Sequence, residues 1–258
     1  MIGIIYFVVI LLSCILGAIV GLGGGVFVRP IFDAVGYHNV MNISFFASSA
    51  ILTMAAVSTI KKLRDGTEID YKIALLISSG AVIGGVLGNL ALEHLISVFE
   101  FEATVQRVQI IFTVIFLGLS IFLTAKSTLR FELKSKVLCF ALGIFLGAEA
   151  AFLGIGGGPI NVPILMIFFG FSIKVATAYS IVIIFFSHLS RLVTMGFTVG
   201  YGYFDLHILV FVIPAAALGG LIGAQFSKTF SEETVKKLFL VTISAVIVLN
   251  IVNGLFII

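Results

Sequence analysis

Four ionisable side chains lie within long apolar stretches of this 258-residue chain: Arg29, Glu149, His188 and Arg191. A charge in hydrocarbon costs at least about 2.5–3.5 kcal/mol, so each must face a cavity, pair with another charge or extend to the membrane surface. Guanidinium groups bind oxyanions through paired hydrogen bonds, and a carboxyl group among apolar atoms can exchange a proton near neutral pH. These residue types indicate an anion path with a candidate proton-coupling residue, Glu149.

The three basic residues each have two interpretations. Arg29 either clamps an oxyanion with its planar guanidinium, or extends to the lipid headgroups with Asp33, one helical turn later, as its ion-pair partner. His188 and Arg191 lie three residues apart and share a helix face. Either they line the anion path, or Arg191 marks the end of its helix and His188 packs in the core.

Glu149 is the one carboxylate well inside an apolar run, and it precedes a glycine cluster by five residues. We interpret it as the proton-coupling residue. Two structural alternatives remain open, a static ion pair with Arg191 or Arg29 and a protonated carboxyl held by hydrogen bonds. Asn161, beside the same cluster, adds a neutral hydrogen-bond donor.

Two glycine clusters interrupt the apolar pattern, GLGGG at 21–25 and GIGGG at 154–158. Glycine weakens a helix, and the N–H and C=O groups that it exposes are tolerated in a membrane only beside a cavity or inside protein. Each cluster precedes an apolar run, 26–36 or 160–171, that is too short to span. The N–H groups at the start of such a half-helix would bind an anion without a charged side chain. Alternatively, the glycines only permit close helix packing.

The expected substrate site combines these clusters with the basic residues. Pro159 suits the first turn of the second half-helix, where its missing N–H costs nothing. The expected substrate-binding residues are Gly21, Gly23, Gly24, Gly25, Arg29, Pro30, Gly154, Gly156, Gly157, Gly158, Pro159, Asn161, Pro163, His188 and Arg191.

The other polar residues have simpler interpretations. Asp70 and Asp205 each precede an apolar helix and are expected to cap it. The remaining histidines, His38, His94 and His207, form no ligand spacing with cysteines or acidic residues, so no metal or cofactor is expected. No arrangement typical of nucleophilic catalysis is evident, and the protein is not expected to be an enzyme.

Composition indicates the elements that position these residues. Hydrophobic residues make up 60% of the chain and charged residues 10%, against roughly 25% in a soluble domain. At roughly 20 residues per crossing, this length supplies about eight spanning helices and excludes a soluble domain. The net charge of +3 is too small and scattered for a nucleic-acid surface. Cys14 and Cys139 are expected to be packing residues, and the first apolar segment, which lacks a basic start, is expected to stay in the mature protein.

The chain contains one unit twice. GLGGGVFVRP matches GIGGGPINVP, and Asp70 with three following glycines aligns with Asp205 and its three glycines. Repeats of this type are typical of secondary transporters, whose substrate site lies at the repeat interface. We expect an all-α, polytopic integral membrane protein with a first repeat at 1–125, a polar linker at 126–136 and a second repeat at 137–258.

The basic residues favour inverted repeats. If each glycine-broken segment enters and returns as a hairpin, each repeat adds three transmembrane helices, and this odd number inverts the second copy. Setting aside Arg29 and Arg191, the arrangement places 12 of the other 13 Lys and Arg residues on one side and only Arg107 on the other. Single crossings would give 8 against 5. The positive-inside rule therefore predicts the hairpins, with both termini outside the cytoplasm.

The doubled glycine motif, together with GGLIGAQFSKTFSEETVKKLF at 219–239, resembles the sulfite exporter TauE/SafE family over essentially the whole chain. The resemblance implies a multi-pass permease of the cell inner membrane for small sulfur-containing anions such as sulfite, thiosulfate or organosulfonates. It supports both glycine clusters with Pro30 and Pro163. It does not extend to the four ionisable residues named first, which depart from the apolar or small residues expected there.

Together these features predict a transporter that alternates access around an oxyanion bound at the glycine clusters. Its partners are then the anion and membrane lipids, with no nucleic acid and with oligomerisation left open. An anion channel with a glycine filter is one alternative, and an intramembrane enzyme that uses Glu149 and His188 as acid and base is another. An inside-negative potential drives anion export unaided, whereas import would need a coupling ion, for which Glu149 is the candidate.

Overall fold

The protein is all-α throughout the residues that the computed structural model describes, which are 2–67, 69–99, 101–125, 131, 133, 135–155 and 159–256. Eight of its helices are long and apolar enough to cross a membrane, and the two short ones, α2 and α7, are not. The elements are α1 (Ile2–Val20), α2 (Gly25–Val35), α3 (Val40–Arg64), α4 (Tyr71–Val98), α5 (Glu102–Ala125), α6 (Lys136–Leu153), α7 (Asn161–Phe169), α8 (Ile173–Thr198), the 3-10 turns η1 (Tyr201–Tyr203) and η2 (Leu206–Ile208), α9 (Leu209–Thr229) and α10 (Glu232–Phe256).

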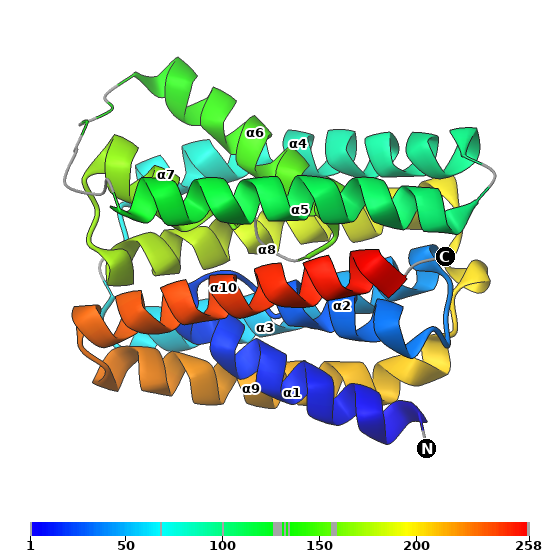
Figure 1. Ribbon diagram of the computed structural model, residues 1–258. Coiled ribbons are helices and arrows are strands. Elements are labelled where there is room, and N and C mark those ends of the chain that lie inside the picture. The colour runs from blue at the N-terminus through cyan, green and yellow to red at the C-terminus, as the bar shows by residue number, and fades with distance from the viewer. Residues whose placement is uncertain are drawn as a thin grey trace.

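Each short helix folds back along the helix before it. The Tyr6 hydroxyl, near the start of α1, lies 2.8 Å from Nδ1 of His38, which follows α2. In the second half, the backbone N–H of Phe131, which precedes α6, donates to the carbonyl oxygen of Ile167 in α7 at 2.6 Å. The α1–α2 pair has its outer ends where the chain termini lie, whereas the α6–α7 pair has its outer ends at the opposite end of the bundle (Figure 1).

Two tight helix pairs join one half of the chain to the other. Helix α4 packs on α6, and α9 packs on α1. A β-carbon placed on Gly88 would lie 2.2 Å from the carbonyl oxygen of Ala148, and one on Gly223 would lie 2.4 Å from that of Ile15. Gly88 and Gly223 occupy aligned positions in the two halves. The same helix contact is therefore made twice, once by each half. Small residues allow such close backbone approach between membrane helices.

The α4–α6 contact provides a test of this packing. Gly88→Leu should push α4 away from α6, and overpacking of this kind costs about 1–3 kcal/mol or more. We expect a lower thermal unfolding midpoint for the purified variant in detergent. Gly118→Leu in α5 is the matched control, because a β-carbon there would have no atom within 4 Å. Equal midpoints for the two variants would contradict the packing described.

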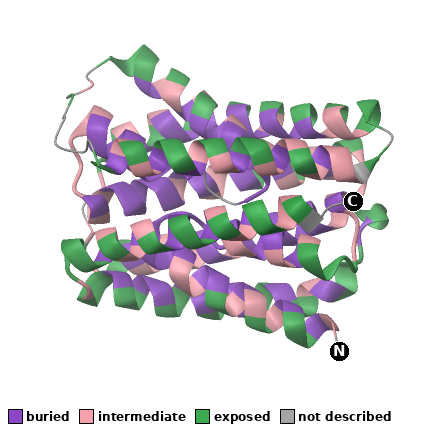
Figure 2. Ribbon diagram, viewed as in Figure 1, coloured by how far each residue is buried: buried purple, intermediate pink, exposed green. Residues whose placement is uncertain are grey.

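The outer surface of the bundle is apolar, as a surface in contact with lipid should be. Buried residues gather between the helices, and exposed residues cover the outward faces (Figure 2). Many of these exposed residues are large and hydrophobic, for example Phe197, which is 88% exposed, and Val137, which is 76% exposed. Such continuous apolar exposure exceeds what a soluble monomer presents and matches the candidate membrane spans.

Several simple expectations from the sequence are confirmed. The Asp70 carboxylate accepts a hydrogen bond from the backbone N–H of Lys72 at 2.8 Å and caps α4. The expectation for Asp205 is met only in part: its carboxylate accepts from the N–H of His207 at 3.1 Å and caps the 3-10 turn before α9, whereas α9 itself starts after Ile208 without a side-chain cap. Both cysteines are buried and free. The division into two repeats with a linker stays a prediction, and most of the linker lies outside the described residues.

Candidate functional site

The two glycine segments meet in the middle of the bundle. A β-carbon placed on Gly25 would lie 2.6 Å from the carbonyl oxygen of Ile155, so the two backbones are in direct contact. Neighbouring helices satisfy carbonyl groups of both segments. The Ser180 hydroxyl of α8 donates to the Gly21 carbonyl, and the Ser120 hydroxyl of α5 donates to the Pro159 carbonyl, each at 2.6 Å. Irregular backbone at membrane depth survives only with such partners or beside a cavity.

The two short helices begin at this meeting point without side-chain caps. Four long helices, α3, α4, α6 and α8, each start with a side chain that accepts a hydrogen bond from a first-turn N–H. Helix α2, which starts after Gly24, and α7, which starts after Ile160, have no such bond. Their first N–H groups, together with the positive end of the helix dipole, suit an anion. Gly156, Gly157 and Gly158, which the sequence also assigns to this site, lie outside the described residues.

The prolines occupy different places along the two short helices. Pro159 was expected in the first turn of α7 but lies in the turn before it, because α7 begins at Asn161. Pro163 is within the first turn of α7, and Pro30 is inside α2. The Asn253 side chain of α10 donates to the Pro30 carbonyl at 2.6 Å and so ties α10 to α2.

Arg29 is buried and fully engaged. Arg29 is only 3% exposed, so the interpretation that its side chain extends to the lipid headgroups is wrong. Its guanidinium donates to the Ser44 hydroxyl at 3.0 Å, to the Leu153 carbonyl at 3.1 Å and to the side chain of Gln109. The ion pair with Asp33 is present, with Nε 3.6 Å from Oδ2. Because its own neighbours hold Arg29, its guanidinium has a fixed position.

Arg191 is also completely buried but has few partners. Its Nε donates to the Asn89 side-chain oxygen at 3.3 Å. Within the described part of the chain, neither terminal nitrogen of its guanidinium has a hydrogen-bond partner. The alternative that Arg191 marks the end of its helix is wrong, because α8 continues to Thr198. A buried cation with free N–H groups is costly unless an anion accompanies it.

Gly154 brings the two arginines together. It ends α6 with a left-handed backbone conformation (φ 64°), which glycine adopts without strain. A β-carbon here would lie 2.6 Å from one terminal nitrogen of Arg29 and 3.1 Å from one of Arg191. The two guanidinium groups therefore approach the same backbone point. The negative end of the α6 dipole offsets part of their mutual repulsion.

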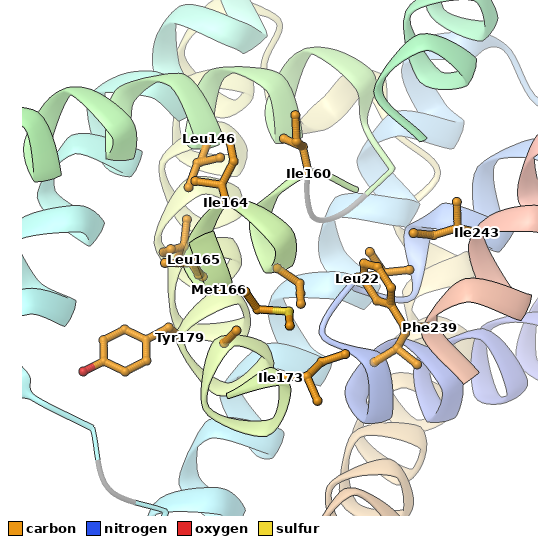
Figure 3. Close-up of a cluster of buried hydrophobic side chains, with 14 of the residues drawn as sticks. Leu22, Leu146, Ile160, Ile164, Leu165, Met166, Ile173, Tyr179, Phe239 and Ile243 are labelled. Carbon is orange, nitrogen blue, oxygen red and sulfur yellow. The ribbon is translucent and has the colours of Figure 1, made fainter. Parts of the chain in front are cut away.

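Apolar side chains from both halves surround the glycine segments. Leu22 from the first segment and Ile160 from the second belong to one buried cluster with Phe239 and Ile243 of α10 (Figure 3). Such surroundings exclude water, and electrostatic interactions are stronger where water is excluded. An anion at the arginine pair would be held more strongly than one at the surface.

Three further residues from the expected site are buried without a hydrogen-bond partner in the described part of the chain: Glu149, Asn161 and His188. His188 lies one turn before Arg191 on α8. Glu149 makes no ion pair with either arginine, so the static ion-pair alternative is wrong. It lines an open apolar groove of about 350 Å³ between α4, α5 and α6. Glu149 is thus separate from the arginine pair, although both involve α6.

A family model decides what kind of protein carries this site. The model for "Sulfite exporter TauE/SafE" matches residues 6–249. The chain belongs to the sulfite exporter TauE/SafE family. This membership and the eight candidate spans make it a multi-pass membrane transporter.

The relatives of this TauE/SafE protein include two curated proteins. "Probable membrane transporter protein YunE" of Bacillus subtilis (strain 168) is 24% identical over 250 residues, which cover 87% of this chain and 88% of that protein. "Probable membrane transporter protein MJ0441" of Methanocaldococcus jannaschii is 22% identical over 238 residues, covering 85% and 84%. No solved structure gives a significant match.

Three polar residues that hold the arginines of this TauE/SafE chain were not predicted from its sequence. Asn89 contacts Arg191, whereas Ser44 and Gln109 contact Arg29. Asn89 and Gln109 lie inside apolar runs, so a search of these runs for uncharged polar side chains would have found them. Ser44 carries no such signal, because serine is common in membrane helices.

Proposed function

We propose that the protein transports small sulfur-containing oxyanions, such as sulfite, thiosulfate or an organosulfonate, across the cell membrane as a non-enzymatic permease. The observation that carries the proposal is the buried Arg191, whose terminal nitrogens have no partner among the described residues and lie beside Arg29 at Gly154. The uncapped starts of α2 and α7 support it, because they offer backbone N–H groups near the same place. The family description supports the sulfur-containing class of substrate.

The proposed mechanism is alternating access around this central site, with the two halves arranged as inverted repeats. The α1–α2 and α6–α7 pairs open toward opposite ends of the bundle, which supports the inverted arrangement (Figure 1). Rocking of the α4–α6 pair against the α9–α1 pair, each of which combines a helix from both halves, would expose the arginine pair first to one side and then to the other. The contacts of α4 with α6 and of α9 with α1 join the halves, so each pair would move as a unit.

Export is the direction that the membrane potential favours. An inside-negative potential drives an anion outward by about 2.3 kcal/mol per charge per 100 mV. Export then needs no coupling ion. Uptake against this potential would need one, and we assign that role to Glu149, whose burial without a partner in the described part of the chain supports proton exchange.

Flux measurements test the proposal. Proteoliposomes containing the purified protein are expected to release sulfite or thiosulfate with saturable rates and to show counterflow when unlabelled anion is present on the other side. Empty liposomes provide the background. Flux that is linear in concentration and shows no counterflow would instead indicate a channel. Conversion of the anion into another compound would indicate an enzyme.

Glu149→Gln separates coupling from binding. The substitution keeps the side-chain shape but replaces the carboxyl group, which can gain and lose a proton, with an amide that does not titrate. We expect uptake driven by an imposed pH gradient to fall to the background of empty liposomes, while efflux driven by potential alone keeps its rate. Glu233→Gln, the same substitution at an exposed carboxylate, is the matched control and should leave both rates unchanged. Unchanged pH-driven uptake in Glu149→Gln would remove Glu149 from the mechanism.

A further inference from the structure

A second group of basic residues lines a cavity at the end of the bundle opposite the chain termini. The cavity has a volume of about 150 Å³ and lies where the end of α3, the start of α8 and the end of α9 meet. Lys62, Lys174 and Lys228 line it, together with Asp65 and Ser227. Neither Arg29, Arg191 nor any of their hydrogen-bond partners lines this cavity.

Lys62 is the most buried of these lysines. The residue is 6% exposed, and its ammonium group donates to the Ser227 hydroxyl at 3.1 Å. An ammonium group has three N–H donors, so this bond leaves two of them without a protein acceptor among the described residues. No carboxylate of the described chain forms an ion pair with Lys62. A charge buried in this way calls for an anionic partner.

Lys174 adds a second uncompensated charge to the same cavity. Its ammonium donates to the carbonyl oxygens of Lys228 at 3.2 Å and of Phe230 at 2.9 Å, and no carboxylate of the described residues pairs with it. It is also in the first turn of α8, where the helix dipole makes a cation unfavourable. The positive charges of Lys174 and Lys62 repel each other. Lys174 thus caps the C-terminal end of α9 but, like Lys62, has no carboxylate partner among the described residues.

Asp65 does not supply the missing negative charge, because two other lysines share it. Its carboxylate lies 2.9 Å from the ammonium of Lys61 and 3.2 Å from that of Lys228. The hydrogen bond from Lys61 lowers the pKa of Asp65 below its usual value, and Lys228 acts in the same direction. Asp65 thus stays ionised but is already paired. Lys62 and Lys174 remain without a counter-charge.

We propose that this cavity binds an oxyanion group, either a free phosphate- or sulfate-like ion or the phosphate of an anionic lipid. A volume of 150 Å³ has room for about five water molecules at roughly 30 Å³ each, enough for a tetrahedral oxyanion with some of its hydration. Ammonium groups bind phosphate as point charges. A bound oxyanion would join α3 to α8 and α9 and thereby stabilise this end of the bundle.

Phosphate binding by the purified full-length protein tests the free-ion source. Inorganic phosphate is titrated calorimetrically in uncharged detergent, with ionic strength kept constant by chloride. Lys62→Gln and Lys174→Gln are each expected to weaken binding about tenfold or more, the loss expected for one charged hydrogen bond. Lys237→Gln should change binding less than about twofold, because Lys237 is an exposed lysine at the same end that pairs with Glu233.

A lipid ligand is tested by native mass spectrometry with phosphatidylglycerol and phosphatidylcholine. Retention of phosphatidylglycerol by the wild type, with loss in Lys62→Gln, would support the proposal with a lipid as the source. Lys228→Gln changes a half-exposed lysine of the same cavity and serves as the test variant if the buried variants do not fold. Weaker binding of phosphate or phosphatidylglycerol by this variant would then support the proposal. The proposal does not depend on the proposed transport site, so Arg191→Gln should retain phosphate. The proposal would be overturned if the wild type and all lysine variants bound phosphate equally and phosphatidylglycerol equally. It would also be overturned if Lys237→Gln lost as much binding as Lys62→Gln.

Discussion

Arg191→Gln is expected to weaken sulfite binding strongly while leaving the folded protein as stable as the wild type or more so. The wild-type guanidinium has terminal N–H groups without partners in the described part of the chain, which makes them available to an anion. Hydrogen bonds to charged groups contribute about 1.5–3 kcal/mol each, so loss of two of them should raise the Kd roughly 100-fold or more. Removal of an unpaired buried cation also removes its desolvation cost.

Arg29→Gln should behave differently although the two arginines are neighbours. Arg29 forms an ion pair with the nearly buried Asp33, and it also holds Ser44 and Gln109. Breaking a buried ion pair from one side costs about 3–5 kcal/mol, so we expect a clear loss of thermal stability together with weaker binding. Arg29 would thus position the site, and Arg191 would provide its free donors.

Calorimetric titration with sulfite and thermal unfolding of the same samples distinguish the two roles. Arg64→Gln, an exposed arginine at the end of α3, is the matched control and should change neither measurement. If Arg191→Gln bound sulfite as tightly as the wild type, the backbone N–H groups at the glycine segments would be the better account of the site. If Arg29→Gln were as stable as the wild type, the ion pair with Asp33 would not be structural.

The sequence was sufficient to predict the local elements of this fold. Glycine clusters and a change in polarity bound the two short helices, so the expected runs 26–36 and 160–171 differ little from Gly25–Val35 and Asn161–Phe169. The prolines were harder to place, because a proline is compatible with both the first turn and the residues before it. That ambiguity explains why Pro159 lies one turn earlier than expected.

Long-range contacts explain why the site could be predicted only in part. Arg29 contacts Gln109 and Leu153, which are 80 and 124 residues away along the chain, and Arg191 contacts Asn89 across 102 residues. Periodicity and composition report on neighbours within a helix and carry no information about such pairs. For the same reason the sequence could not exclude an ion pair between Glu149 and an arginine. The approach of both arginines to Gly154 depends on how α2, α6 and α8 pack.

Gly25→Ala should slow transport by separating the two glycine segments. A β-carbon at this position would lie 2.6 Å from the carbonyl oxygen of Ile155 and 2.7 Å from its carbonyl carbon. Backbone atoms cannot turn away as a flexible side chain can, so α2 must move relative to the segment after α6. An added carbon in a tightly packed interior costs about 1–3 kcal/mol, and a transport barrier raised by the same amount would slow sulfite efflux about 5- to 150-fold.

The matched substitution Gly118→Ala separates this effect from the intrinsic properties of alanine. Both glycines are helical, and alanine favours a helix by about 1 kcal/mol over glycine, so local propensity alone predicts that each variant is at least as stable as the wild type. Gly118 in α5 has no atom within 4 Å of the added carbon, and its variant should transport at the wild-type rate. Sulfite efflux from proteoliposomes measures both. A fully active Gly25→Ala protein would show that the contact with Ile155 is incidental to transport.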